Sequence, residues 1–201
     1  MSIRGLLALA LCAAPAAGQV VYDEAVHGPL STNNLNPTDL GVFGVGVHTV
    51  SGTVVDAIAA GDVDVFTFEI AAGTALTGLF ATAYQGSDPV LFMAIAAGPS
   101  FPFNAGELFG GDQDAYLGSL HFGALEVALG TDLLPGLGAG ENTGGAGSGF
   151  VPPLGPGIYT MYIQQTGPTP VSYGLAFVVV PAAPTGALAA AGLLCAARRR
   201  R

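Results

Sequence analysis

Aspartates at alternate positions are the residues of this sequence best suited to bind a metal ion. Asp62 and Asp64 stand in the stretch AGDVDVF, and Asp112 and Asp114 stand in GGDQDAY. Calcium takes six to eight oxygen ligands from carboxylates and carbonyls, and loops rich in Gly and Asp supply them at this spacing. Neither pair continues as a full calcium-binding loop, and aspartate also closes turns through its own side chain. Two alternatives therefore stay open at both pairs: a calcium site, with no other cofactor expected, or turn residues.

The sequence lacks the signatures of the common catalytic sites. Its three histidines, His27, His48 and His121, form no pair at i, i+4. The stretch GAGSGF has Ala and Phe where a G-x-S-x-G motif needs glycines. We therefore expect no enzymatic activity and assign no catalytic residue; a secreted hydrolase is the weakest alternative that we keep.

Charge is distributed very unevenly along the chain. All 14 acidic residues lie between Asp23 and Glu141, whereas the five basic residues are Arg4 and Arg198 to Arg201. A domain with this charge is repelled by phosphates, which excludes nucleic acid as a partner. Polysaccharide stays open as a partner, because exposed aromatic rings can stack on sugars. The candidate rings, each of which could equally be packed in the fold, are Tyr84, Tyr116 and Tyr162.

Residues 1–18 have the pattern of a secretory signal peptide. Arg4 gives a small positive region, an apolar run follows from Gly5 to Ala14, and APAAG supplies the small residues that signal peptidase needs. The pattern predicts an N-terminal signal helix with cleavage after Gly18 or Ala16, and hence export of the rest of the chain.

The stretch VPAAPTGALAAAGLLCAARRRR, from residue 180 on, carries a second set of signals. Thirteen apolar or small residues, Thr185 to Ala197, would span about 20 Å as a helix, and four arginines follow them. An apolar run next to arginines predicts a transmembrane helix with the arginines on the cytoplasmic side. The exported domain would then be anchored to the cell envelope.

This three-part tail resembles the PEP-CTERM class of bacterial sorting signals. The matching positions are Pro181 and Pro184 in PAAP, which lacks the glutamate of the namesake triad, and then the apolar run and Arg198, Arg199, Arg200 and Arg201. The resemblance implies recognition over residues 181–201 by an exosortase-type membrane protease, and a surface or extracellular location after processing. An ordinary single-span membrane anchor is the alternative.

Residues 47–180 have the pattern of an all-β domain. Phe66, Phe68 and Ile70 alternate with residues of the opposite face, and similar runs recur between turn signals rich in Gly, Pro and Asp. We expect seven or eight strands in a single, jelly-roll-like β-sandwich. The last two strands, GIYTMYIQQT and VSYGLAFVVV, are expected to pair with each other around the turn GPTP. The Gly-rich stretch 136–157 is expected to be a flexible surface loop. Cys12 and Cys195 both lie outside this domain, so it forms no disulfide.

The stretches AGDVDVFTFEIAAGT and GPGIYTMYIQQTGPTPVSYGLAFVV resemble the central strand and the closing hairpin of bacterial pre-peptidase C-terminal (PPC) domains. The resemblance implies a small exported β-sandwich over residues 47–180, with residues 19–46 as an extension that leads into it. PPC domains are appendages of secreted proteins, some of which bind matrix polymers or calcium.

These features together predict an exported, non-catalytic protein of the cell envelope or extracellular matrix. Its partners would be the membrane, through the tail helix, the sorting protease and extracellular polysaccharide. The main alternative is a dedicated carbohydrate- or calcium-binding module with one defined site.

Overall fold

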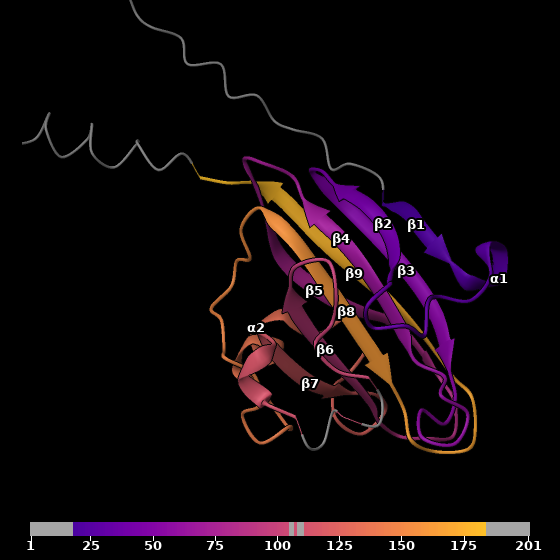
Figure 1. Ribbon diagram of the computed structural model, residues 1–201. Helices are drawn as coiled ribbons and strands as arrows, with labels where there is room; N and C mark the ends of the chain where they lie inside the picture. Colours follow the sequence, from indigo (N-terminus) through magenta and orange to yellow (C-terminus); the bar gives the residue numbers. More distant parts are fainter. Residues whose placement is uncertain (1–17, 105–106, 108–110, 184–201) are drawn as a thin grey trace, which may run out of the picture.

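A computed structural model describes residues 18–104, 107 and 111–183 of the chain (Figure 1). Two α-helices, α1 (Glu24–His27) and α2 (Leu134–Ala139), and one 3-10 helix, η1 (Gln113–Ala115), are short. The strands are β1 (Gln19–Asp23), β2 (Thr38–Phe43), β3 (Gly46–Val54), β4 (Asp64–Ile70), β5 (Thr74–Gln85), β6 (Leu91–Ala97), β7 (Gly118–Phe122), β8 (Gly157–Gln164) and β9 (Val171–Pro181). The described chain is therefore built mainly of strands.

The strands form two sheets that share one apolar core. One sheet has the order β1-β3-β9-β5 and the other the order β2-β4-β8-β6-β7. From β3 to β6, successive strands alternate between the two sheets. This arrangement confirms the prediction of an all-β fold. Residues 19–46 contribute β1 and β2, each of which pairs in parallel with a strand of the domain that follows.

The core is filled by the alternate residues that the period-2 pattern indicated. Phe66, Phe68 and Ile70 of β4 are buried, and Phe177 of β9 contacts both phenylalanine rings from the opposite sheet. Phe43 of β2 stacks on Phe68 with the ring centroids 5.0 Å apart. Burial of each such side chain stabilises the fold by about 1.5–3 kcal/mol, so the sheets are held together without any disulfide.

Part of the outer face of the five-stranded sheet is covered by the connection between β6 and β7. Phe101 and Tyr116 of this connection are buried against Tyr162 of β8, whose ring stacks on that of Phe101 at a centroid distance of 4.8 Å. Tyr116 and Tyr162 are thus packing residues and present no ring to a ligand.

The expected pairing of the last two strands is wrong. β8 lies between β4 and β6 in one sheet, whereas β9 lies between β3 and β5 in the other. The connection between them crosses from sheet to sheet, and the Gln165 side chain holds it by bonding to the main chain of Gly167 and Thr169. A side-chain amide has thus replaced the main-chain hydrogen bonds that would close a hairpin.

The Gly-rich stretch 136–157 is folded against the edge of β7. Helix α2 ends at Gly140, whose φ of 65° is left-handed and suits glycine. Farther along, the N–H groups of Ser148 and Gly149 donate to the carbonyls of Tyr116 and Leu117. The stretch therefore covers a sheet edge, where a flexible loop was expected.

The prediction of a transmembrane helix needs correction. Among residues 18–104, 107 and 111–183, no helix is long and apolar enough to cross a membrane. The two α-helices have four and six residues, while a span of the roughly 30 Å hydrocarbon core takes about 20. The stretch Thr185 to Ala197, to which the helix was assigned, lies outside the described residues, as do most of the signal peptide, Pro184 and the four arginines.

Candidate functional site

The two pairs of candidate aspartates lie in different parts of the fold, and the side chains of Asp62 and Asp112 accept hydrogen bonds from nearby main-chain N–H groups. Asp62 Oδ2 accepts a hydrogen bond from the Val55 N–H at 2.9 Å and so closes the loop before β4. Asp112 Oδ1 accepts from the Asp114 N–H at 3.1 Å at the start of η1, and both residues are exposed. In the described part of the chain, no three His, Cys, Asp or Glu side chains are grouped to hold a metal ion. The geometry thus favours the turn alternative for Asp62 and Asp112.

Asp64 has a different environment, inside the protein at the start of β4. Its side chain is only 1% exposed, and its Oδ2 accepts a hydrogen bond from the Tyr173 hydroxyl at 2.6 Å. Tyr173 belongs to β9, so this bond joins the two sheets. Gly52 of β3 lies opposite Tyr173, and a Cβ there would lie 2.5 Å from Asp64 Oδ2. The absence of a side chain at position 52 therefore makes room for the bond.

Glu24 of α1 brings a second carboxylate to Asp64. Its two oxygens accept from the Leu30 N–H at 2.6 Å and from the Thr53 N–H at 2.7 Å, which fastens α1 to β3. Burial, then repulsion from Glu24 and Asp62, raise the pKa of Asp64 well above its usual range, and the Tyr173 hydroxyl only partly offsets this. Burial, then the Asp64 carboxylate and, after it, Glu24 and Asp62 raise the pKa of Tyr173. Asp64 therefore keeps its proton to a higher pH than an exposed aspartate does.

Sequence reasoning found Asp64 but missed both of its neighbours. Tyr173 is 109 residues away in the chain, and Glu24 comes from a segment without a clear period-2 signal. The one available signal was that an aspartate directly precedes a run of buried residues, where a carboxylate must find a partner or stay protonated.

The three histidines are all bonded to main-chain carbonyls. His27 Nδ1 lies 3.0 Å from the Asp23 oxygen, His48 Nε2 lies 2.7 Å from the Gly44 oxygen, and His121 Nδ1 lies 2.9 Å from the Asn142 oxygen. His48 is also buried and stacked on Phe43. These bonds fix each ring to its local backbone.

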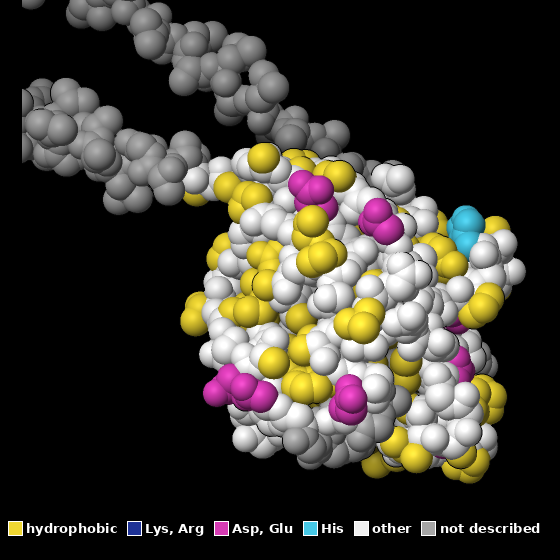
Figure 2. All heavy atoms as spheres, in the orientation of Figure 1, with side chains coloured by type: hydrophobic (Ala, Val, Ile, Leu, Met, Phe, Trp, Pro, Cys, Tyr) yellow, Lys and Arg dark blue, Asp and Glu magenta, His cyan; other side chains and the backbone are white. Residues whose placement is uncertain are grey.

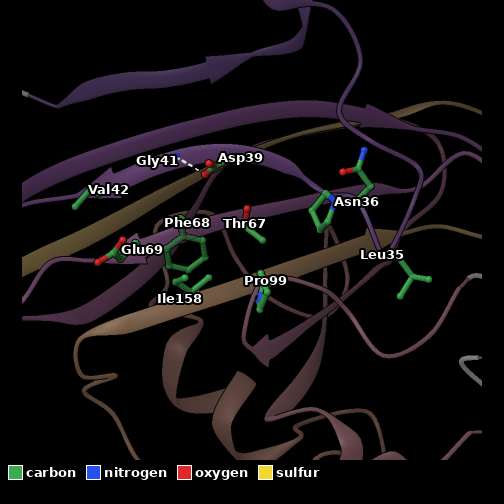
Figure 3. Close-up of a pocket in the computed structure, with 11 residues that line it drawn as sticks. Leu35, Asn36, Asp39, Gly41, Val42, Thr67, Phe68, Glu69, Pro99 and Ile158 are labelled. Carbon is green, nitrogen blue, oxygen red and sulfur yellow. Dashed lines mark hydrogen bonds between the residues drawn. The ribbon is translucent and has the colours of Figure 1, made fainter.

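One hollow opens over strands β2, β4 and β8 on the outer face of the five-stranded sheet (Figure 3). Its volume is about 370 Å³. Val42 and Glu69 lie side by side at one end of it, and Leu35 and Asn36 lie at the other. We call it the β2 hollow; its lining is Leu35, Asn36, Pro37, Asp39, Gly41, Val42, Thr67, Phe68, Glu69, Pro99 and Ile158.

A second hollow, of about 290 Å³, is lined by Asp88, Val90, Phe92, His121, Gln164, Gln165 and Thr166. It combines the half-buried ring of Phe92 with imidazole, amide, carboxylate and hydroxyl groups. Tyr84 donates to the Asp88 carbonyl at 2.6 Å, and burial together with the Asp88 carboxylate raises the pKa of Tyr84 to about 12. The Tyr84 hydroxyl therefore holds the loop that carries Asp88 through this hydrogen bond. We call this the His121 hollow.

Comparison of the chain with protein-family models, with curated proteins and with solved structures found no match.

Proposed function

We propose that this chain is an exported, non-catalytic protein of the cell envelope or extracellular matrix. Its two-sheet domain is the mature part, and the stretch from Pro181 to Arg201 is a sorting signal for an exosortase-type protease. The observation that carries the proposal is the separation of charge: every carboxylate belongs to the folded domain, and every basic residue belongs to one of the two flanking signals. Figure 2 shows acidic side chains scattered over one face of that domain.

Two features of the fold support this proposal. The histidine rings are engaged by main-chain carbonyls, which favours a non-catalytic domain. Strands β3 to β6 alternate between the two sheets, and β9 lies between β3 and β5. This order supports the jelly-roll topology that we propose for the domain. We assign the domain to that topology and to the PPC-like sandwiches. The β4 stretch and the stretch over β8 and β9 resemble those sandwiches in sequence, although β8 and β9 do not pair as a hairpin.

The sorting signal gives a direct test. Replacing Arg198 to Arg201 with serines removes the positive charge that follows the apolar run, and we expect unprocessed or misrouted protein in a host that has an exosortase-type protease. Lysines at the same four positions keep the charge and serve as the matched control. Cell fractionation together with the mass of the mature chain is the measurement. Unchanged location and mass in the serine variant would rule out the sorting proposal.

A carbohydrate-binding module is the second candidate, and the His121 hollow favours it. The Phe92 ring stands there beside groups that donate and accept hydrogen bonds, the combination that sugars require. With a soluble neutral glucan as the probe, we expect Phe92→Ala to weaken binding about three- to tenfold. The control is Ile158→Ala, because Ile158 is an exposed apolar residue of the same sheet that lies outside this hollow. Equal binding by both variants and the parent chain would remove this candidate.

A further inference from the structure

The β2 hollow combines carboxylates with exposed apolar side chains. Asp39 and Glu69 supply the negative charge, while Leu35, Val42 and Ile158 are 74%, 60% and 44% exposed. Side chains of this size are exposed singly on many surfaces, but here they line one concavity. Such a lining suits a segment that is apolar at one point and positively charged a few residues away.

The edge of the hollow is not built to accept an added β-strand. Strand β2 bulges between Asp39 and Val42, and Gly41 within the bulge has a left-handed φ of 74°. The Asp39 carboxylate accepts the Gly41 N–H at 2.9 Å, as the dashed line in Figure 3 shows. Bulges and edge carboxylates of this kind discourage pairing with another strand. The occupant must therefore bind through its side chains.

Charge complementarity then selects the occupant. The described residues contain 14 carboxylates and no lysine or arginine, so the hollow has no cation of its own. Apart from Arg4, the only basic residues of this chain are the four arginines 198–201. They directly follow the apolar stretch Leu193-Leu194-Cys195-Ala196-Ala197. We infer that residues 193–201 dock in the β2 hollow of the same molecule, with the leucines on the apolar lining and the arginines at Asp39 and Glu69.

The place where the described chain ends makes this contact reachable. The Ala182 N–H donates to the Gly73 carbonyl, and the Ala71 N–H donates to that of Phe43, which is next to Val42. These links place Val42 on the order of 20 Å from Ala182. The thirteen residues from Ala183 to Cys195 can extend about 40 Å. The contact can therefore form within one molecule. It goes beyond the proposed function, since it would occupy the sorting signal before any protease does.

Cys195 provides the test, because it lies in the proposed docking segment. In the full chain with Cys12→Ser, we compare Val42→Cys with Val45→Cys under glutathione oxidation. Val45 is also exposed, at 55%, and lies in the turn after β2 but outside the hollow. We expect the intramolecular disulfide to Cys195, measured by peptide mass mapping, to form about tenfold faster at position 42.

Two further variants make the test specific. Glu69→Gln and replacement of Arg198 to Arg201 with glutamines should each remove most of the preference for position 42. Glu126→Gln, an exposed carboxylate elsewhere, should leave it intact. Equal rates at positions 42 and 45, or disulfides that form mainly between molecules, would overturn the inference. The proposed sorting would survive that failure, because it is tested separately by localisation.

Discussion

Gly52→Ala is expected to lower the free energy of unfolding by about 1–3 kcal/mol, the cost of leaving a buried polar group without its hydrogen-bond partner. A Cβ at position 52 would lie 2.5 Å from Asp64 Oδ2, 2.6 Å from the Tyr173 hydroxyl oxygen and 2.8 Å from the Tyr173 ring. Both side chains are about 1% exposed, so neither can move aside into solvent. The added methyl group must separate them and leave the Asp64 carboxyl without its donor.

The control for this prediction is Gly44→Ala, in the turn between β2 and β3. A Cβ there would meet no atom within 4 Å, and Gly44 does not have a left-handed φ. Urea denaturation of both variants gives the comparison. If Gly52→Ala were as stable as Gly44→Ala, the Asp64–Tyr173 bond would not hold the sheets together as described.

Residues that act through a local pattern could be predicted from the sequence. In β4 the inward positions Phe66, Phe68 and Ile70 follow from strict alternation, because successive side chains of a strand point to opposite faces. The pattern does not say what covers the other face. Thr67 lies on that face and is buried all the same. The alternation therefore predicts correctly that Thr67 points away from the core between the sheets. It does not predict that Thr67 is buried there.

Pairing between sheets could not be predicted in the same way. A Gly-Pro turn signal between two apolar runs predicts a hairpin when only neighbours in sequence are considered. Here β8 pairs with β4 and β6, and β9 pairs with β3 and β5, all of which come earlier in the chain. The Gln165 side chain stabilises the connection that crosses from β8 to β9. The energy that decides the pairing comes from contacts distant in sequence.

The calcium site stays a prediction, and the sequence could not have decided it for the same reason. Asp62 and Asp64 have the spacing of calcium ligands, but spacing alone does not distinguish a ligand from a carboxyl that bonds to its own fold. For Asp64 the distinction lies in Tyr173 and in the space above Gly52, neither of which is near it in sequence. The charge of Asp64 in the native protein thus depends on long-range packing.

Asp64→Asn is expected to stabilise the protein increasingly as the pH rises. The unfolded chain releases the Asp64 proton near pH 3.9, whereas the native pKa is well above that value because of burial and the nearby Glu24. Between the two pKa values the unfolded state binds fewer protons, so the stability of the parent protein falls as pH rises, by about 1.4 kcal/mol per pH unit. Asparagine has no proton to lose and can still accept from Tyr173.

Free energies of unfolding in urea, measured from pH 4 upward, test this sign. The two proteins should be similarly stable at pH 4, and the variant should gain on the parent until the native pKa of Asp64 is reached. Asp112→Asn is the matched control at an exposed carboxylate and should not change the slope. Glu24→Gln should shorten the pH range of the effect, because it removes the larger of the two carboxylate repulsions at Asp64. Parallel curves for Asp64→Asn and the parent would mean that Asp64 is ionised in the native protein, and the hydroxyl of Tyr173 would then stabilise a buried carboxylate rather than a carboxylic acid.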